Sequence, residues 1–358
     1  MVDSEVREQM LSPVPATSSL PGIGGLIKQR FEDFVVDEVA AYPPDGREGR
    51  HLFLRIRKRG VSTPDLIRNL SHALRIESRE VGCAGRKDRE AVTTQWLSVP
   101  YESRDGIDRL KLEGVEVIEA RPHGQKLRMG HLHGNRFRIV IRDPGMDLES
   151  ARHLVREKVL AMARGGGLEN LYGGQRFGHG GENLDRGLDL LRAGRRPNPT
   201  EKFLLSAAQS GLFNLYVVLR RGQGWLRQAL PGDLLQKRDG GALFAVEDVA
   251  VEQPRLNRGE LVVSGPIFGA KMRAPDDPSP ASLLEQEVLR RADVPAELFG
   301  AFGKNLPGSR RPVQVSLSDF RVTEIEPDDE LAGGLELRFG LPAGSYATQL
   351  IRELQSGP

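Results

Sequence analysis

Asp88 is the residue whose type and setting could most directly do chemistry. It ends the run Gly-Arg-Lys-Asp at residues 85–88, and small apolar residues precede this run. An aspartate in a turn usually bonds neighbouring backbone amides, and on the residues alone this is the more common role. The alternative is a carboxylate that nearby cations keep ionised, so that it can act as a base or a nucleophile. The candidate cations are Lys28, Arg86, Lys87 and Arg89.

Motifs of the common cofactor-dependent and nucleophilic enzymes are missing from the sequence. It contains no G-x-G-x-x-G fingerprint, no G-x-x-x-x-G-K-[ST] loop, no H-E-x-x-H helix and no G-x-S-x-G elbow. His131 and His133 have no carboxylate beside them, so a surface or RNA-contacting pair is favoured over a metal site. Cys83 is the only cysteine, which excludes an intramolecular disulfide and a paired-cysteine zinc site. We therefore expect neither a metal nor a cofactor.

Short strands and one helix must position Asp88. Alternating apolar residues predict strands at 31–39, 51–58, 93–99, 115–120 and 135–142. A helix is expected to begin with Thr63 as N-cap and Pro64 at its first position, with an apolar face from Leu66 onward. A second helix is expected over 147–163. Asp88 then lies in the connection that precedes the strand at 93–99.

The composition changes after Gly165-Gly166-Gly167, which we interpret as a hinge because glycine has the greatest backbone freedom. Helical segments predominate from there to about residue 305, and strands return at 312–323 and 335–341 before a last helix at 346–354. The pattern predicts an α/β (α+β) protein with one inserted domain. The expected divisions are a mobile polar tail at 1–20, a core segment at 21–164, the insertion at 165–308 and a second core segment at 309–358.

The 358 residues suggest about two domains of roughly 150 residues each. Lys and Arg number 51 against 49 Asp and Glu, so overall charge does not by itself indicate nucleic-acid binding. The cations are nevertheless clustered, and such clusters can neutralise phosphates locally or simply form solvated surface. The clusters are Arg55, Arg57, Lys58 and Arg59; Arg121, Lys126 and Arg128; Arg195 and Arg196; Arg310 and Arg311.

The sequence also bears on the compartment. It has no run of about 18 apolar residues, so no membrane-spanning helix is expected. The N-terminus carries acidic residues and lacks an apolar core, which argues against a secretory signal. We therefore expect a cytoplasmic protein without membrane association.

Six short motifs follow one another along the chain. They are Ile27-Lys28 with Glu32-Asp33-Phe34-Val35-Val36; Ala84-Gly85-x-Lys87-Asp88-x-x-Ala91-x-Thr93-x-Gln95; Gly134-Asn135-x-Phe137; Asn170-x-x-Gly173-x-Gln175-Arg176-Phe177-Gly178; Ser206-Ala207 with Leu212-Phe213-Asn214; and Leu341-Pro342-x-Gly344-Ser345-Tyr346-Ala347-Thr348 with Arg352-Glu353. Their order resembles the TruD family of tRNA pseudouridine synthases, from about residue 22 to residue 354. The resemblance implies a pseudouridine-synthase core with a mixed, mainly antiparallel sheet, interrupted by a domain peculiar to this family.

The resemblance also implies a reaction and roles for four residues. The reaction would be isomerisation of uridine to pseudouridine in tRNA, at position 13, without a cofactor. Asp88 would be the catalytic carboxylate and Lys28 its ionic partner, while Asn135 would support the catalytic loop by hydrogen bonds. Phe137 would stack on the target base once that base has left the helical stack. On the residues alone, Lys28, Asn135 and Phe137 would be a solvated lysine, a turn cap and an inward-facing strand residue.

Further residues are candidates for contacts with RNA through charge, hydrogen bonds or stacking. They are Lys87, Gln175, Arg176, Phe177, Arg195 and Arg196. The partner implied is tRNA, and the sequence indicates no protein partner. For Gln175, Arg176 and Phe177, packing within the inserted domain is the competing role.

Alternatives stay open on the sequence alone. Asp88 could attack C1′ of the ribose, or it could remove the proton from C2′. A catalytically silent RNA-binding or RNA-folding protein on the same scaffold is a second function, although the intact Lys87-Asp88 run argues against it. A nucleoside hydrolase is a third, but it would want a second carboxylate or a metal to activate water.

Overall fold

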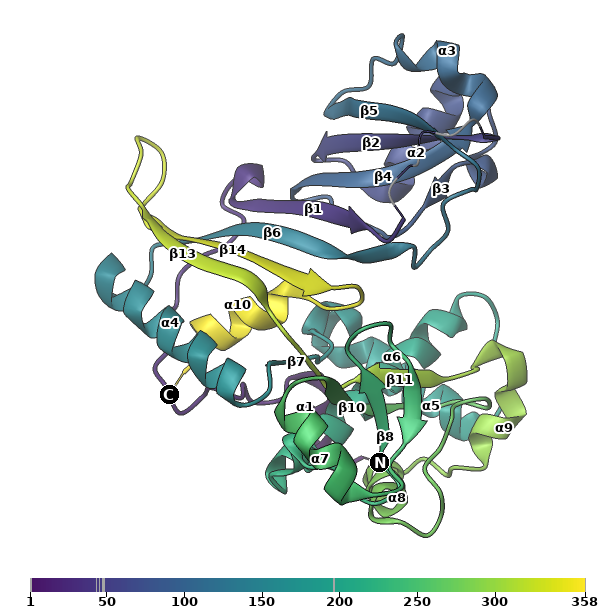
Figure 1. The fold of residues 1–358 in the computed structure, drawn as a ribbon, viewed down its shortest axis with the longest axis vertical. Coiled ribbons are helices and arrows are strands. Elements are labelled where there is room, and N and C mark those ends of the chain that lie inside the picture. Colours follow the sequence, from purple (N-terminus) through teal and green to yellow (C-terminus); the bar gives the residue numbers. More distant parts are fainter. Residues whose placement is uncertain (1, 43, 45, 47–48, 196, 358) are drawn as a thin grey trace. The chain divides into compact units, whose positions relative to one another are not determined.

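The computed structural model describes residues 2–42, 44, 46, 49–195 and 197–357. The chain forms two compact units. The sheet unit comprises residues 23–157 and 317–345, and the helical unit comprises the described parts of 1–22, 158–316 and 346–358. Figure 1 traces the chain through both units, and each is described by itself below.

A twisted sheet forms the sheet unit (Figure 1). Its strands are β1 (Phe34–Ala40), β2 (His51–Arg59), β3 (Gly82–Cys83), β4 (Val92–Pro100), β5 (Val115–His123), β6 (Leu132–Arg142), β13 (Ser318–Ile325) and β14 (Gly334–Pro342). The strand order is β13-β14-β6-β1-β4-β2-β5, with β3 beside β4. Only β1 and β4 pair in parallel among the described strands. The predicted mixed, mainly antiparallel sheet is confirmed.

Three helices accompany this sheet. They are α2 (Thr63–Leu74), α3 (Arg104–Ile107) and α4 (Leu148–Arg164), whose last turns belong to the helical unit. Leu66 and Leu70 of α2 are fully buried in a cluster with apolar residues of β2 and β4. Burial of each leucine contributes about 2 kcal/mol, so this helix is held by its apolar face.

The N-cap of α2 is Ser62, not Thr63 as predicted. The Ser62 hydroxyl accepts a hydrogen bond from the backbone N–H of Asp65 at 3.2 Å, and Thr63 is the first helical residue. Both residues are good N-caps, so residue type alone could not choose between them. The shift releases the Thr63 hydroxyl for contacts outside the helix.

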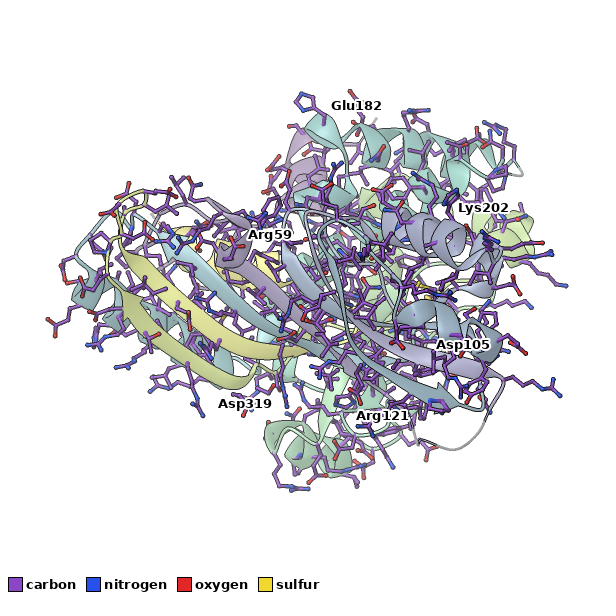
Figure 2. The ribbon with its side chains drawn as sticks, turned by 90° about the horizontal axis from the view of Figure 1, so that it is seen from above. Arg59, Asp105, Arg121, Glu182, Lys202 and Asp319 are labelled. Carbon is purple, nitrogen blue, oxygen red and sulfur yellow. The ribbon has the colours of Figure 1, made fainter. Side chains whose placement is uncertain are left out.

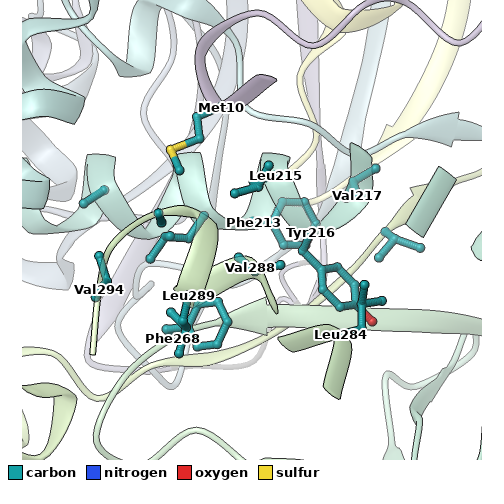
Figure 3. Close-up of a cluster of buried hydrophobic side chains, with 14 of the residues drawn as sticks. Met10, Phe213, Leu215, Tyr216, Val217, Phe268, Leu284, Val288, Leu289 and Val294 are labelled. Atoms are coloured by element: carbon teal, nitrogen blue, oxygen red, sulfur yellow. The ribbon is translucent and has the colours of Figure 1, made fainter. Parts of the chain in front are cut away.

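The helical unit is built from helices and short strands. These elements are α1 (Ser4–Leu11), α5 (Glu182–Ala193), α6 (Glu201–Gly222), α7 (Val249–Asn257), α8 (Pro280–Arg291), α9 (Leu298–Phe302) and α10 (Ala347–Gln355), with α9 a single short turn, and β7 (Leu168–Glu169), β8 (Leu234–Lys237), β9 (Leu243–Ala245), β10 (Leu261–Ile267), β11 (Ser309–Pro312) and β12 (Gln314–Val315). Figure 3 shows part of the core, a single cluster that includes Phe213 and Tyr216 of α6, Met10 of α1 and Val288 of α8.

Helix α6 is the central element of this core. By length and composition it could cross a membrane, yet 72% of its most apolar window is buried inside the protein. Its buried residues occupy all sides of its middle turns, including Leu212, Phe213 and Leu215. A helix that is apolar all round is typical of the core of a large unit.

The predicted mobile tail at 1–20 is wrong for the residues described. Residues 4–11 form α1, and Met10 is fully buried in the core of the helical unit. The amide of Asn214 donates to the Met10 carbonyl at 2.8 Å, and the Thr17 hydroxyl donates to the Glu353 carboxylate at 2.8 Å. The segment is polar in sequence, so its order comes from these long-range contacts, which a local pattern cannot reveal.

The unit boundaries also differ from the predicted domains. The helical unit begins within α4 rather than at residue 165, and it includes the N-terminal segment and α10. The predicted glycine hinge lies inside this unit. At Gly167, φ is +125° and a Cβ would lie 2.3 Å from the carbonyl oxygen of Val315, so close packing of the backbone requires glycine there.

Candidate functional site

The parallel pairing of β1 and β4 brings Lys28 and Asp88 together. In this pair Val35 is opposite Val92, so the segments that precede both strands enter the sheet at the same end. The Lys28 ammonium lies 3.6 Å from a carboxylate oxygen of Asp88. The aspartate side chain is 55% exposed and the lysine side chain 19%, so the carboxylate is open to a substrate while its cation is partly sheltered.

Lys28 is held in an unusual backbone conformation. Its φ is +59°, in the left-handed region that a lysine adopts only at a cost. Its ammonium lies 4.7 Å from the centre of the Phe34 ring, which adds a cation–π attraction. It also borders a cavity of about 200 Å³ whose other lining residues are Gln29, Phe31 and Glu90. The strained residue thus presents its charge to Asp88 at the edge of an open cavity.

The loop that carries Asp88, residues 85–90, is fixed from beneath by α2 and β2. The Thr63 hydroxyl accepts the backbone N–H of Lys87 at 2.9 Å and donates to the Gln95 side chain at 2.9 Å. The Lys58 ammonium donates to the carbonyl oxygen of Asp88 at 2.9 Å. These bonds fix the backbone on both sides of the Lys87–Asp88 peptide.

Lys58 was predicted only as part of a surface cluster, yet it is buried, with 1% of its surface exposed. One sequence signal could have found it. Leu52, Leu54 and Ile56 point to the covered face of β2, and Lys58 is the next residue of the same parity. Burial lowers the pKa of Lys58 to about 8; nearby Asp88 acts to raise it and Lys87 to lower it.

Lys87 was predicted to contact RNA, but it points inward. Its ammonium lies 2.7 Å from a carboxylate oxygen of Glu38, and both side chains are almost wholly buried. The other carboxylate oxygen of Glu38 accepts the backbone N–H of Trp96 at 3.2 Å. A buried, ion-paired ammonium has no surface to offer a phosphate, so Lys87 tethers the loop to β1 instead.

Phe137 lies on the face of the sheet that carries Lys28. It pairs with Val36 across β1 and with Phe339 across β14, and residues paired in this way share a face with Phe34. Phe137 is 9% exposed, and its ring stacks on Phe339 with centroids 5.2 Å apart. One face of the ring is therefore covered by the fold.

Asn135 lies two residues earlier in β6, opposite Glu38. Its side-chain oxygen is buried and has no hydrogen-bond partner within the described part of the chain. The hydrogen bonds that it was expected to make to the catalytic loop are therefore absent from the described residues. A buried acceptor without a donor is uncommon and marks a place for a ligand or a water molecule.

The candidates of the helical unit divide by burial. Gln175 is exposed, whereas Phe177 is 1% exposed and belongs to the hydrophobic core, so its predicted contact with RNA is wrong. Arg195 is exposed and pairs with Glu201. Arg196 lies outside the described residues. The Phe177 error has a simple cause, because an aromatic residue after a polar motif is equally suited to stacking and to packing.

Arg176 is half-buried and surrounded by aromatic rings. Its guanidinium donates to the hydroxyls of Ser206 and Ser210 on α6. It lies 5.2 Å from the centre of the Phe203 ring and 5.9 Å from that of Tyr172. Phe203 is 48% exposed, which is unusual for a phenylalanine in a unit with so large a core. No feature of the sequence had singled out Phe203.

The described residues contain no group of three or more His, Cys, Asp or Glu side chains that could hold a metal ion. His131 packs against Tyr42 with ring centroids 5.8 Å apart, and His133 is exposed. Of the other basic clusters, Arg310 ion-pairs with Glu285 and its side chain is nearly buried, so it is not a phosphate contact.

Comparison with known proteins agrees with this arrangement. A family model described as tRNA pseudouridine synthase D (TruD) matches residues 15–193 and 182–354. A protein from Thermus thermophilus named tRNA pseudouridine synthase D is 41% identical over 341 residues, which cover 94% of this chain and 90% of that protein. A protein of the same name from Anaeromyxobacter dehalogenans is 41% identical over 352 residues and covers 95% of both.

One solved structure is similar over nearly the whole chain. It comes from Methanosarcina mazei and is described as a tRNA pseudouridine synthase D; it has a TM-score of 0.76, 22% identity, and coverage of 99% of this chain and 98% of that one. At this identity the likeness concerns the fold. The family is shown by the sequence matches: the chain belongs to the TruD family, described as tRNA pseudouridine synthase D.

Proposed function

We propose that this protein converts uridine to pseudouridine in tRNA and that Asp88 is its catalytic carboxylate. Membership of the TruD family supports the reaction. The observation that carries the role of Asp88 is its exposed carboxylate 3.6 Å from the partly sheltered Lys28 ammonium. The cation lies close enough to orient the carboxylate, and a carboxylate is a group that can act as base or nucleophile.

The reaction explains why one carboxylate is enough. The bond between C1′ and N1 breaks, its electron pair stays on the uracil, and the detached ring turns so that C5 bonds to C1′. C5 then loses its proton and N1 gains one, so that substrate and product have the same atoms and no electron is exchanged. Asp88 acts either by adding to C1′ or by removing the C2′ proton, and it is regenerated in both routes.

Phe137 is proposed to pack against the target base. It lies on the same face of the sheet as Lys28, and Phe339 holds its ring in place. Base–aromatic stacking stabilises by about 1–3 kcal/mol and depends little on the orientation of the base. Such a contact suits a ring that must turn between two bonds to the same ribose.

Contacts with the remainder of the tRNA are proposed for the exposed or half-buried candidates of the helical unit, Gln175, Arg176 and Arg195. Arg176 has the strongest support, because Phe203 beside it exposes an aromatic surface on which an unpaired base could stack. We further propose position 13 as the modified uridine and the cytoplasm as the compartment. Both rest on family membership.

The test is the substitution Asp88→Asn, with Asp105→Asn as the matched control. Asp105 lies in the same unit, and its side chain is 83% exposed on α3 (Figure 2). Unmodified tRNA is incubated with each variant, and pseudouridine is located by mass spectrometry of digested RNA. Asp88→Asn should bind tRNA and form no pseudouridine, while Asp105→Asn should match the unmodified protein.

Three results would contradict parts of the proposal. Substantial turnover by Asp88→Asn would remove its catalytic role. Pseudouridine at another position would refute the assignment to position 13. Binding of tRNA without any modification by the unmodified protein would favour a silent RNA-binding protein on the same scaffold.

A further inference from the structure

Lys58 is a buried cation without a carboxylate partner. Its ammonium donates to the carbonyl oxygens of Val61 at 2.5 Å, Asp88 at 2.9 Å and Lys87 at 3.5 Å. Within the described residues it forms no ion pair with a carboxylate, although other buried cations of the sheet unit have such a partner. Burial of an ammonium group is costly, and buried charges are normally paired.

We propose that Lys58 is a positioning residue for the catalytic step, one that fixes the loop and presents its charge to Asp88 from beneath. Its bonds to two consecutive carbonyls set the direction in which the Asp88 side chain leaves the backbone. The buried ammonium also places a positive charge beneath the loop that carries this carboxylate. This inference rests on the catalytic role proposed for Asp88.

The surrounding charges leave Asp88 as the group on which Lys58 can act. Two charged side chains are near enough to act on it electrostatically, Asp88 and Lys87, both from the loop. The charge of Lys87 is taken up by Glu38 at 2.7 Å. Asp88 therefore lies between two cations, with Lys28 beside its exposed carboxylate and Lys58 behind its backbone. The Lys28 side chain is 19% exposed, whereas Lys58 is fully buried.

The proposal has a pH signature. Burial lowers the pKa of Lys58 to about 8, so the ammonium loses its proton as the pH rises through this value. Deprotonation removes the charge behind Asp88 and one of the three N–H donors of Lys58, which bond Val61 and the two loop residues Lys87 and Asp88. The chemical step should therefore slow above about pH 8. A residue at this position that does not titrate should remove this fall in rate.

The experiment compares Lys58→Met and Lys58→Arg with the unmodified protein. Pseudouridine formation is followed in a single turnover with enzyme in excess over tRNA, from about pH 6 to about pH 9.5, and tRNA affinity is measured separately. At neutral pH, Lys58→Met should be at least about tenfold slower, equal to about 1.4 kcal/mol in the barrier, with tRNA affinity changed less than about twofold. Its rate should no longer fall above about pH 8.

Lys58→Arg keeps a charge that does not titrate in this range. This variant should recover part of the rate at neutral pH, and its rate should not decrease above about pH 8. Lys111→Met serves as the control, since Lys111 is exposed in the same unit. It should keep both the rate and the pH profile of the unmodified protein.

The opposing outcomes are distinct. A Lys58→Met variant with the rate and pH profile of the unmodified protein would overturn the inference while leaving Asp88→Asn to test the reaction. A variant that is merely less stable, and whose folded fraction reacts normally, would show that Lys58 only holds the fold. If the unmodified protein forms no pseudouridine, the proposed function fails and this inference fails with it.

Discussion

Lys58 in the sheet unit and Arg220 in the helical unit are two buried cations with opposite surroundings. Each is at most 1% exposed. All five N–H donors of Arg220 have acceptors, two of them the carboxylate oxygens of Asp233 and one the Tyr216 hydroxyl. Burial alone would lower the pKa of Arg220, but Tyr216 and Asp233 hold it above its ordinary value. Lys58 is bonded to neutral carbonyls only.

We interpret this difference as one between a cation that completes a fold and a cation that serves the proposed site. The charge of Arg220 is cancelled where it stands, by a bidentate pair with the geometry that guanidinium and carboxylate favour. The charge of Lys58 has no carboxylate partner among the described residues, and it lies close to an aspartate whose side chain is exposed to solvent. Perturbed pKa values cluster at functional sites, and the pKa of Lys58 is lowered by burial.

The largest expected effect is on the free energy of unfolding, which should differ between variants of Arg220 and Lys58. Arg220→Met should lower the free energy of unfolding by about 3–5 kcal/mol, because Asp233 is then buried without a partner. Lys58→Met should lower it less, by about 1–2 kcal/mol, since the variant loses hydrogen bonds but also removes an uncompensated charge. Denaturant unfolding gives the two values, and hydrogen exchange assigns each loss to one unit. Equal losses would break the comparison.

Glu169 is a second buried ionisable residue of the helical unit, and it should make the stability of the protein depend on pH. Burial raises the pKa of Glu169 to about 7; Arg221, 3.1 Å away, acts to lower it and Glu353 to raise it. Its folded pKa lies above the unfolded value, so the stability it contributes is present below about pH 4.5 and is lost as the pH rises through about 7. The loss amounts to at most about 3 kcal/mol.

Glu169→Gln should remove this dependence. The free energy of unfolding of the unmodified protein should fall relative to that of the variant between about pH 4.5 and about pH 7, and the difference should be constant above about pH 8. Denaturant unfolding at a series of pH values measures it. A variant whose stability parallels that of the unmodified protein across this range would show that Arg221 neutralises Glu169 completely.

The smallest expected effect tests whether Arg176, unlike Arg220, contacts RNA rather than only stabilising the helical unit. Arg176 bonds two serine hydroxyls and has no carboxylate partner among the described residues, so its charge is available to RNA. Phe203→Ala should weaken tRNA binding by about 1–3 kcal/mol without slowing the chemical step at saturation. Leu283→Ala, at an exposed leucine of α8, should leave binding unchanged. If both variants bind tRNA with equal affinity, Arg176 and Phe203 serve packing within the unit rather than contact with RNA.

The sequence by itself determined the family, the mixed sheet and the pairing of Lys28 with Asp88 as a hypothesis. Period-2 patterns placed the strands, and the ordered motifs named the carboxylate and its expected partners. It also contained an unused signal, the parity of Lys58 with Leu52, Leu54 and Ile56 in β2. These properties are local, since they follow from residue type and from spacing within one element.

Only the tertiary structure decided which of the candidate residues face inward. Lys87 and Phe177 carry no local mark of burial, yet Glu38 and the core of the helical unit enclose them. Residues 4–11 likewise become ordered only through distant contacts. A side chain's burial depends on which elements pack over it, and such packing joins residues far apart in the chain. The chemistry of Asp88 could thus be proposed from the sequence, while the groups that hold its loop were decided by the fold.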